Sequence, residues 1–286
     1  MRAQGKVRFA AVGDIHCRKE SAGTFRDMFR YASSIADALL LCGDLTDYGL
    51  PEEARILADE LGAVNVPIVA VLGNHDFESD AQDEVRRILM DAGVQVLEGE
   101  ACEIYGVGIA GAKGFAGGYG RATLGSWGER AIKAFVNEAL QEALKFESAL
   151  AKLRTPERLA LLHYAPIAGT VQGEPPEIFP FLGTSRLEEP LIRYPVSAVL
   201  HGHAHRGSPE GTTVNGTPVY NVAMPLLRRT YSEQQPFRVI ELPESRSSAV
   251  EPAAHDADAI SPSPANDSQL FESFHKKSKA APKPRA

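Results

Sequence analysis

The residues best suited to chemistry in this chain lie in five short blocks rich in histidine and aspartate. Six of the eight histidines fall within them. The blocks are Gly13-Asp14-Ile15-His16, Gly43-Asp44, Gly73-Asn74-His75-Asp76, Leu162-His163-Tyr164 and His201-Gly202-His203-Ala204-His205. Carboxylates, one amide and several imidazoles together suit a pair of divalent first-row metal ions. Proteins use two adjacent metals to hydrolyse phosphate esters by in-line attack, and this is the chemistry that the blocks predict.

Three of the blocks follow a short apolar run, at residues 8–12, 38–42 and 68–72. Such runs are typical of strands buried on both faces. We expect helices between them, roughly over residues 22–35 and 51–61. Asp14, Asp44 and Asn74 are spaced 30 residues apart, which matches the length of a βαβ unit. Parallel strands joined by right-handed crossovers end at one edge of a sheet, where ligands collect, so these three side chains should share one rim.

The rest of the chain continues the alternation of helices and strands. We expect helices near residues 80–92 and 129–153, and strands near 94–97, 102–105, 108–110, 159–162, 197–200, 212–214, 218–221 and 237–242. Asn215-Gly216 predicts a two-residue turn in the hairpin that it joins. Residues 111–128 and 165–184 are rich in Gly and in Pro respectively and predict long loops. A folded domain over residues 1–244 should be followed by a disordered tail at 245–286, which is rich in Ser, Pro, Ala and charge.

Each block is ambiguous alone, and its meaning comes from the others. Asp44 is placed to bridge two metals, and Asn74, more often a turn residue, is interpreted as a neutral ligand. His75 is then free to protonate a leaving oxygen, with Asp76 holding its other ring nitrogen. Helix capping is the alternative for Asp76. For Asp47, which follows nearby, we prefer a turn or capping role.

The remaining histidines complete the ligand count. His163 ends a predicted buried strand, where a lone histidine would more often be structural; here it supplies a further imidazole. His203 and His205 are two residues apart and would share a face in an extended segment. His201 is not needed as a ligand and is assigned a supporting or structural role.

Composition limits the partners and the compartment. The net charge is −7, and the tail from residue 246 contains six Lys/Arg and five Asp/Glu, so the rest of the chain carries −8. An acidic body argues against non-specific nucleic-acid binding, which requires neutralisation of phosphates. Three cysteines without disulfide-like spacing suit a reducing compartment. We find no signal peptide or membrane-spanning segment and expect a cytoplasmic protein.

At this point the ordered set Asp14-x-His16, Gly43-Asp44, Gly73-Asn74-His75-Asp76, His163 and Gly202-His203-x-His205 resembles the calcineurin-like metallophosphoesterase superfamily. It is most similar to the bacterial cyclic-nucleotide-phosphodiesterase-like branch. The resemblance covers residues 7–242 and implies an α/β fold, a four-layer α/β/β/α sandwich. It also implies one metal held by Asp14, His16, Asp44 and His205 and another held by Asp44, Asn74, His163 and His203. The implied cofactors are two divalent or mixed-valence Mn, Fe, Zn or Co ions.

The sequence departs from the family pattern in two places. The stretch Asp47-Tyr48-Gly49 stands where phosphoprotein phosphatases of the superfamily carry Asp-Arg-Gly, which argues against a protein phosphatase. Cys17 stands where many relatives have Gly or a bulky apolar residue. Cys17 could approach the metals, but we prefer the interpretation that it is only a small residue at the rim.

The expected activity is hydrolysis of a small phosphorylated substrate, by a phosphodiesterase or phosphatase acting on an organophosphate or nucleotide. A hydroxide bridging the two metals would attack phosphorus while His75 protonates the departing oxygen. A nuclease and a non-catalytic scaffold are the alternatives. Several residues of the loops and of the block flanks are candidates for contacting phosphate or base, although loop packing or solvation would also explain them: Arg18, Lys113, Tyr119, Arg121, Trp127, Tyr164 and Arg206.

Overall fold

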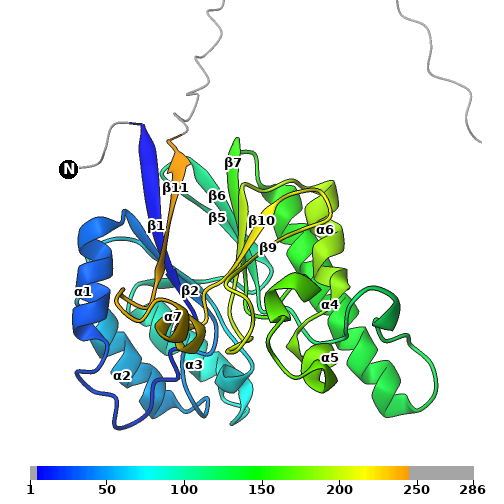
Figure 1. Ribbon diagram of the computed structural model, residues 1–286. Coiled ribbons are helices and arrows are strands. Elements are labelled where there is room, and N and C mark those ends of the chain that lie inside the picture. The colour runs from blue at the N-terminus through cyan, green and yellow to red at the C-terminus, as the bar shows by residue number, and fades with distance from the viewer. Residues whose placement is uncertain (1–4, 245–286) are drawn as a thin grey trace, which may run out of the picture. The chain divides into compact units, whose positions relative to one another are not determined.

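The computed structural model describes residues 5–244, which form two β-sheets packed face to face between two layers of helices (Figure 1). The first sheet has the order β11-β1-β2-β3-β4. Its parallel strands are β1 (Lys6–Val12), β2 (Ala38–Cys42), β3 (Ile68–Val71) and β4 (Val94–Val96), and β11 (Arg238–Pro243) pairs antiparallel with β1. The predicted parallel order of the three strands that precede the first three blocks is confirmed.

The second sheet has the order β5-β6-β7-β8-β10-β9. Its strands are β5 (Glu100–Ile104), β6 (Val107–Ala112), β7 (Glu157–Leu162), β8 (Ala198–His201), β10 (Pro218–Asn221) and β9 (Glu210–Thr212). β6, β7, β8 and β10 are parallel, whereas β5 and β9 are antiparallel to their neighbours at the two edges. The C-terminal ends of β7 and β8 therefore carry the last two blocks to one edge of this sheet.

Three groups of buried side chains separate the four layers. Alternate residues of β1, such as Ala10 and Val12, pack under α1 (Arg26–Ile35), α2 (Pro51–Leu61) and α3 (Gln82–Asp91). The other face of β1, with Phe9, packs against the second sheet through residues such as Leu161. The far face of the second sheet packs under α4 (Arg130–Lys152) and α6 (Glu188–Arg193). The expected four-layer α/β/β/α sandwich is confirmed.

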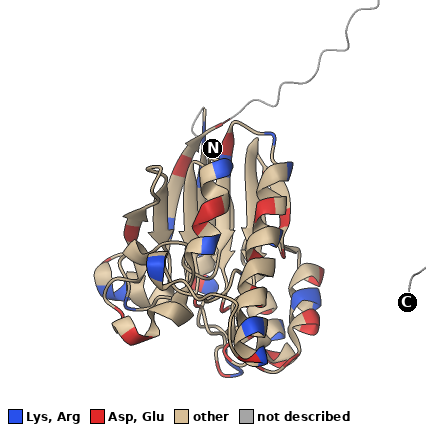
Figure 2. Ribbon diagram, turned by 90° about the vertical axis from the view of Figure 1, so that its right-hand side faces the viewer, with Lys and Arg blue, Asp and Glu red and all other residues tan. Residues whose placement is uncertain are grey.

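The helical layer over the second sheet carries charges of both signs. Seen from the side of α4 and α6, Lys/Arg and Asp/Glu are interspersed along the ribbon without a continuous basic stripe (Figure 2). Among the described residues, no helix is long and apolar enough to cross a membrane.

The structure corrects several predicted elements. The strands of the hairpin pair Pro218 with Thr212, so the loop spans residues 213–217 rather than the predicted two-residue turn. Thr213 closes this longer loop, because its hydroxyl accepts the Thr217 N–H at 3.0 Å. The predicted long loops contain short helical turns, including α5 (Phe179–Leu182), and α6 and α7 (Met224–Thr230) were not predicted. The expected tail at 245–286 lies outside the described residues.

The first helix begins at Arg26, later than predicted, because the preceding segment is held by α2. The carboxylate of Glu60 accepts N–H groups from Gly23 at 2.6 Å, Phe25 at 2.8 Å and Arg26 at 2.7 Å. Helix N-termini leave N–H groups without intrahelical acceptors. Here a carboxylate from the next helix is the acceptor. Glu60 is only 2% exposed, so water does not replace it.

We therefore expect Glu60→Ala to lower the free energy of unfolding by about 1–3 kcal/mol, the cost of leaving buried donors unpaired. Urea unfolding followed by circular dichroism measures this. Glu138→Ala, which removes an exposed carboxylate from the middle of α4, is the control and should change stability by less than about 0.5 kcal/mol. Equal stability of the two variants would contradict the capping role of Glu60.

Candidate metal centre and its surroundings

The predicted ligand residues come from strand ends of both sheets. Asp14 and Asp44 lie two residues beyond β1 and β2, and His163 follows β7 directly. His203 and His205 follow β8. Because the parallel strands of each sheet end at the same edge, the packed sheets bring these segments together.

Four side chains form a first group around Asp14. Donor atoms of Asp14, His16, Asp44 and His205 lie within 4.8 Å of one another. Within the group, His205 Nε2 is 2.8 Å from Asp14 Oδ1, and His16 Nε2 is 3.4 Å from His205 Nε2. This is the set that the sequence predicted for one metal.

A second group shares Asp44 with the first. Donor atoms of Asp44, His163 and His203 also lie within 4.8 Å of one another. His163 Nε2 is 3.3 Å from Asp44 Oδ1 and 2.9 Å from the amide oxygen of Asn74. The structure thus brings Asn74 beside the second group, as predicted, and Asp44 belongs to both.

The backbone at these residues is unusual. Asp14, His16, Asp44 and His203 have φ values of 55°, 47°, 48° and 71°. Non-glycine residues seldom adopt this left-handed region, and such strain concentrates at functional sites. It persists here because the strand ends are held on both sides by buried sheets.

Glycine is required where neighbouring backbones meet the carboxylates. A Cβ on Gly73 would collide with the backbone nitrogen and carboxylate of Asp44, and one on Gly202 would collide with the Asp14 carboxylate. Gly73 and Gly202 therefore allow the close approach of backbone to these carboxylates.

Backbone carbonyls fix the orientation of two histidine rings in the second group. Cys42 O accepts from His163 Nδ1 at 2.9 Å, and Phe181 O accepts from His203 Nε2 at 3.1 Å. A carbonyl can only accept, so these nitrogens carry the protons. The opposite nitrogen of each ring is then left without a proton, as metal ligation requires, and that of His163 lies 3.3 Å from Asp44 Oδ1.

The buried charges favour a cation. Burial raises the pKa of Asp44 well above its usual value, and the charges of Asp14 and Asp76 add to this effect. Burial, together with His203, lowers the pKa of His163 well below its usual value. Burial also opposes ionisation of Asp14, but its hydrogen bond to His205 and the neighbouring imidazoles bring its pKa to about 2. Neutral imidazoles and crowded carboxylates form a donor set that divalent metal ions would stabilise.

Asp76 does not contact the His75 ring, so the predicted hydrogen bond between them is wrong. Its carboxylate is fully buried and accepts N–H groups from Gly73, Leu45 and Thr46 at 2.8, 3.2 and 2.8 Å. Residues His75–Phe77 form a 3₁₀ turn, in which successive side chains point in different directions. Asp76 therefore points inward and ties the β2 and β3 loops together, while His75 faces the rim.

Asp47 takes the place that was assigned to Asp76. Its backbone oxygen accepts from His75 Nδ1 at 2.7 Å. Its carboxylate lies 3.1 Å from His16 Nδ1 and 2.7 Å from Arg18 Nε. The capping role considered for Asp47 is wrong, because the start of α2 is capped by Glu53, whereas the turn role agrees with the bend in which Asp47 lies. In the sequence, the one indication that Asp47 lies near the site is its spacing of three residues from Asp44.

Two residues with open roles prove to be buried. His201 is bonded to Thr170 Oγ1 and to Gly202 O, each at 2.8 Å, and burial lowers its pKa to about 4. Cys17 is packed in the core under α1, and burial raises its thiol pKa to about 12. Neither His201 nor Cys17 belongs to a group of side chains that could hold a metal ion among the described residues, which favours a structural role for both.

The candidate contact residues are scattered. Tyr164 packs on the His203 ring with centroids 4.5 Å apart, whereas Trp127 is 72% exposed.

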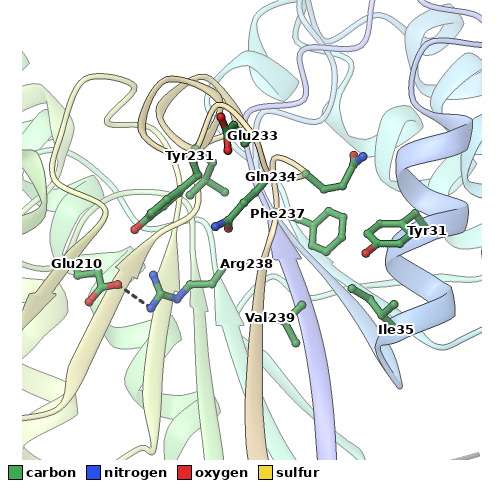
Figure 3. A pocket seen from close by; sticks show the side chains of 11 residues that line it. Tyr31, Ile35, Glu210, Tyr231, Glu233, Gln234, Phe237, Arg238 and Val239 are labelled. Carbon is green, nitrogen blue, oxygen red and sulfur yellow. Dashed lines mark ion pairs between the residues drawn. The ribbon is translucent and has the colours of Figure 1, made fainter.

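A pocket of about 670 Å³ lies elsewhere, between α1, β9 and β11, and includes Tyr31, Phe237 and Arg238 (Figure 3). No predicted metal ligand lines this pocket. The candidate metal centre at the strand-end rim is therefore separate from this cavity.

Comparison with known proteins agrees with the geometry. A family model for calcineurin-like phosphoesterases matches residues 7–207. No curated protein matches the chain. Phosphopantetheinyl hydrolase (PptH) from Mycobacterium tuberculosis is similar in structure, with a TM-score of 0.61 and 16% identity over 83% of this chain and 97% of that protein. A purple acid phosphatase from yellow lupin (Lupinus luteus) seeds has a TM-score of 0.47 and 14% identity over 78% of this chain and 44% of its own.

The low pKa of His201 makes a prediction for the metal-free protein. A histidine with a pKa of about 4 when folded and 6.5 when unfolded binds its proton mainly in the unfolded state between these values. Stability should therefore fall as pH decreases from 7 to 4, by roughly 2–3 kcal/mol from this residue. His201→Gln removes the titration, so the EDTA-treated variant should lose less stability over this range in urea unfolding. Identical losses would show that His201 does not contribute.

Proposed function

We propose that this chain, which belongs to the calcineurin-like phosphoesterase family, hydrolyses a small organophosphate or nucleotide with the help of two metal ions. Family membership makes it a metal-dependent phosphoester hydrolase. The number of metals and the substrate class are our proposals. The observation that carries them is the pair of overlapping ligand groups that share Asp44.

The donor set fits two transition metal ions. Asp14, His16, Asp44 and His205 would hold one ion, and Asp44, Asn74, His163 and His203 would hold the other. Mixed oxygen and nitrogen donors suit Mn, Fe, Zn or Co. When bound, such metals lower the pKa of water towards neutrality and stabilise the charge that develops on a phosphoryl group.

His75 is the residue that we assign as general acid. Its ring lies at the rim, edge-on to His16 with centroids 4.5 Å apart, and its Nδ1 is held by Asp47 O. Because Nδ1 is held as a donor, the form that acts as the acid is the imidazolium, in which Nε2 is also protonated and can give its proton to a leaving oxygen. Asp76 has no such contact, and we assign it the role of holding the loop that carries Asn74 and His75.

Two alternatives are less well supported. A nuclease would need a basic surface for the nucleic-acid backbone, but the chain without its tail carries −8, and the face over α4 and α6 has no continuous basic stripe (Figure 2). A scaffold without activity has no use for a complete ligand set or for a histidine oriented at the rim. Metal content distinguishes an enzyme from a scaffold, because an enzyme should hold close to two metals per chain.

A cytoplasmic location stays a prediction from the sparse cysteines.

The first test of the function compares two substrates. The protein is purified with Mn²⁺, and hydrolysis of an aryl phosphodiester is compared with hydrolysis of the matching monoester. Asp44→Asn should lower turnover by orders of magnitude, because it weakens both ligand groups, and His75→Ala should do so while leaving the metal content intact. Near-normal rates in either folded, metal-loaded variant would contradict the assignments. An inactive wild-type protein with bound metal would favour the scaffold.

The contacts of Asp47 make a separate prediction for metal binding. Partners of metal-binding histidines orient the ring, and their loss typically weakens metal affinity 10–100-fold. Asp47→Ala should therefore raise the dissociation constant of Mn²⁺ by about this factor in calorimetric titration. Asp27→Ala, which removes an exposed carboxylate from α1, should have no effect. Unchanged affinity in Asp47→Ala would show that His16 needs no support from this carboxylate.

A further inference from the structure

Lys113 is the first residue after β6, and it lies beside the second ligand group. β6 and β7 are parallel, with Ala112 paired with Leu162, so Lys113 is next to His163 in register. The N–H groups of His163 and Tyr164 both donate to Lys113 O at 3.1 Å. Neighbours in register point to the same face of a sheet, so the side chains of Lys113 and His163 leave in the same direction.

The ammonium group of Lys113 is surrounded by three aromatic rings. Its nitrogen lies 5.2 Å from the centroid of Phe77, 5.0 Å from that of Phe115 and 5.5 Å from that of Tyr164. Phe77 ends the 3₁₀ turn that begins at His75, and the Tyr164 ring packs on that of His203. The charge is therefore one ring away from the proposed second metal and on the same rim as the general acid.

This charge has no carboxylate partner within ion-pair distance in the described part of the chain. Its one direct hydrogen bond is to Gly114 O at 3.0 Å. The buried acid on α4, Glu142, is already used, because it accepts from Gly114 N–H at 3.0 Å and pairs with Lys145 at 2.8 Å. Burial lowers the pKa of Lys113, while Glu142, Glu138 and Glu98 oppose this at longer range. An ammonium has three donors, so Lys113 keeps capacity for an anion.

We propose that Lys113 binds a non-bridging oxygen of the substrate's phosphoryl group on the side of His163 and His203, and that the preferred substrates are therefore phosphate monoesters. This inference rests on the proposed function. At neutral pH a monoester carries close to two negative charges, because its second pKa is about 6, whereas a diester carries one. A third cationic group beside two metals favours the dianion. Lysine binds phosphate as a point charge, and its flexible stem lets the ammonium leave Gly114 O when an anion arrives.

A purely structural role is the competing explanation, in which the ammonium only packs on the three rings. The two explanations differ in charge dependence and in substrate dependence. Lys113→Met keeps an unbranched apolar stem over the rings and removes the charge. Lys133→Met is the matched control, because it removes the same charge from the exposed face of α4.

The test uses the full chain loaded with Mn²⁺ and measures three quantities. These are metal content, the dissociation constant of inorganic phosphate by calorimetry, and kcat/KM for an aryl monoester and its matching diester. Losing a hydrogen bond to a charged group corresponds to about a 10–100-fold change. In Lys113→Met we expect phosphate to bind 10–100-fold more weakly and monoester kcat/KM to fall by a similar factor, with diester kcat/KM changed only a few-fold. Metal content should stay at the wild-type value, and Lys133→Met should behave as wild type.

Unchanged phosphate affinity together with an unchanged monoester-to-diester ratio in Lys113→Met would overturn the inference, as would a clear diester preference of the wild-type protein. If Lys113→Met does not fold, Lys113→Gln, which keeps donors but no charge, replaces it in the same measurements. Failure of the proposed function is seen separately, as a metal-loaded wild-type protein that hydrolyses neither ester.

Discussion

The structure depends on keeping the Asp44 carboxylate buried beside that of Asp14. Asp44 is 1% exposed and Asp14 is fully buried, and two like charges in this position oppose folding unless something compensates them. Part of the compensation comes from backbone N–H groups, such as that of His75, which donates to Asp44 at 2.9 Å. The rest comes from the imidazoles around the carboxylates and from the cations that the donor set is suited to hold. The left-handed backbone at both aspartates is a second cost, which the buried strands on either side impose.

A layer of backbone and side-chain contacts makes this centre rigid. The carbonyls of Cys42 at the end of β2, of Asp47 in the loop that follows β2 and of Phe181 in α5 each fix one histidine ring. The buried Asp76 carboxylate joins the loops after β2 and β3, because it accepts N–H groups from both. Ring orientation is therefore set before any ligand binds, and in a metal site the loss of such support typically weakens metal affinity 10–100-fold.

The residues at the rim could be predicted from the sequence because they follow from one geometric rule, whereas their division into two ligand groups was implied by the family resemblance. Buried apolar runs that end in Gly-Asp, Gly-Asn or a histidine place polar side chains at the ends of parallel strands, and Asp14, Asp44 and His163 all obey this rule. The same reasoning failed for Asp76 and Asp47, because their roles depend on the direction of a side chain within a 3₁₀ turn and a loop. A sequence spacing does not specify that direction. The short helices α6 and α7 were missed for a related reason, since six or seven residues show too little periodicity to be distinguished from a loop.

The two sheets contribute different chemistry to the centre. The first sheet supplies the oxygen donors Asp14, Asp44 and Asn74, while His163, His203 and His205 come from the second. His16 is the one imidazole of the proposed ligand set that comes from the first sheet, and its Nδ1 lies 3.1 Å from the Asp47 carboxylate. Neither sheet alone can form the centre, so its dimensions are set by how closely the sheets pack. That spacing is determined by the apolar side chains between them, among which Phe9 and Leu161 are fully buried. Because interiors are close-packed and transmit strain, we expect the inter-sheet core to set the distance between the oxygen-bearing side chains of the first sheet and the imidazoles of the second.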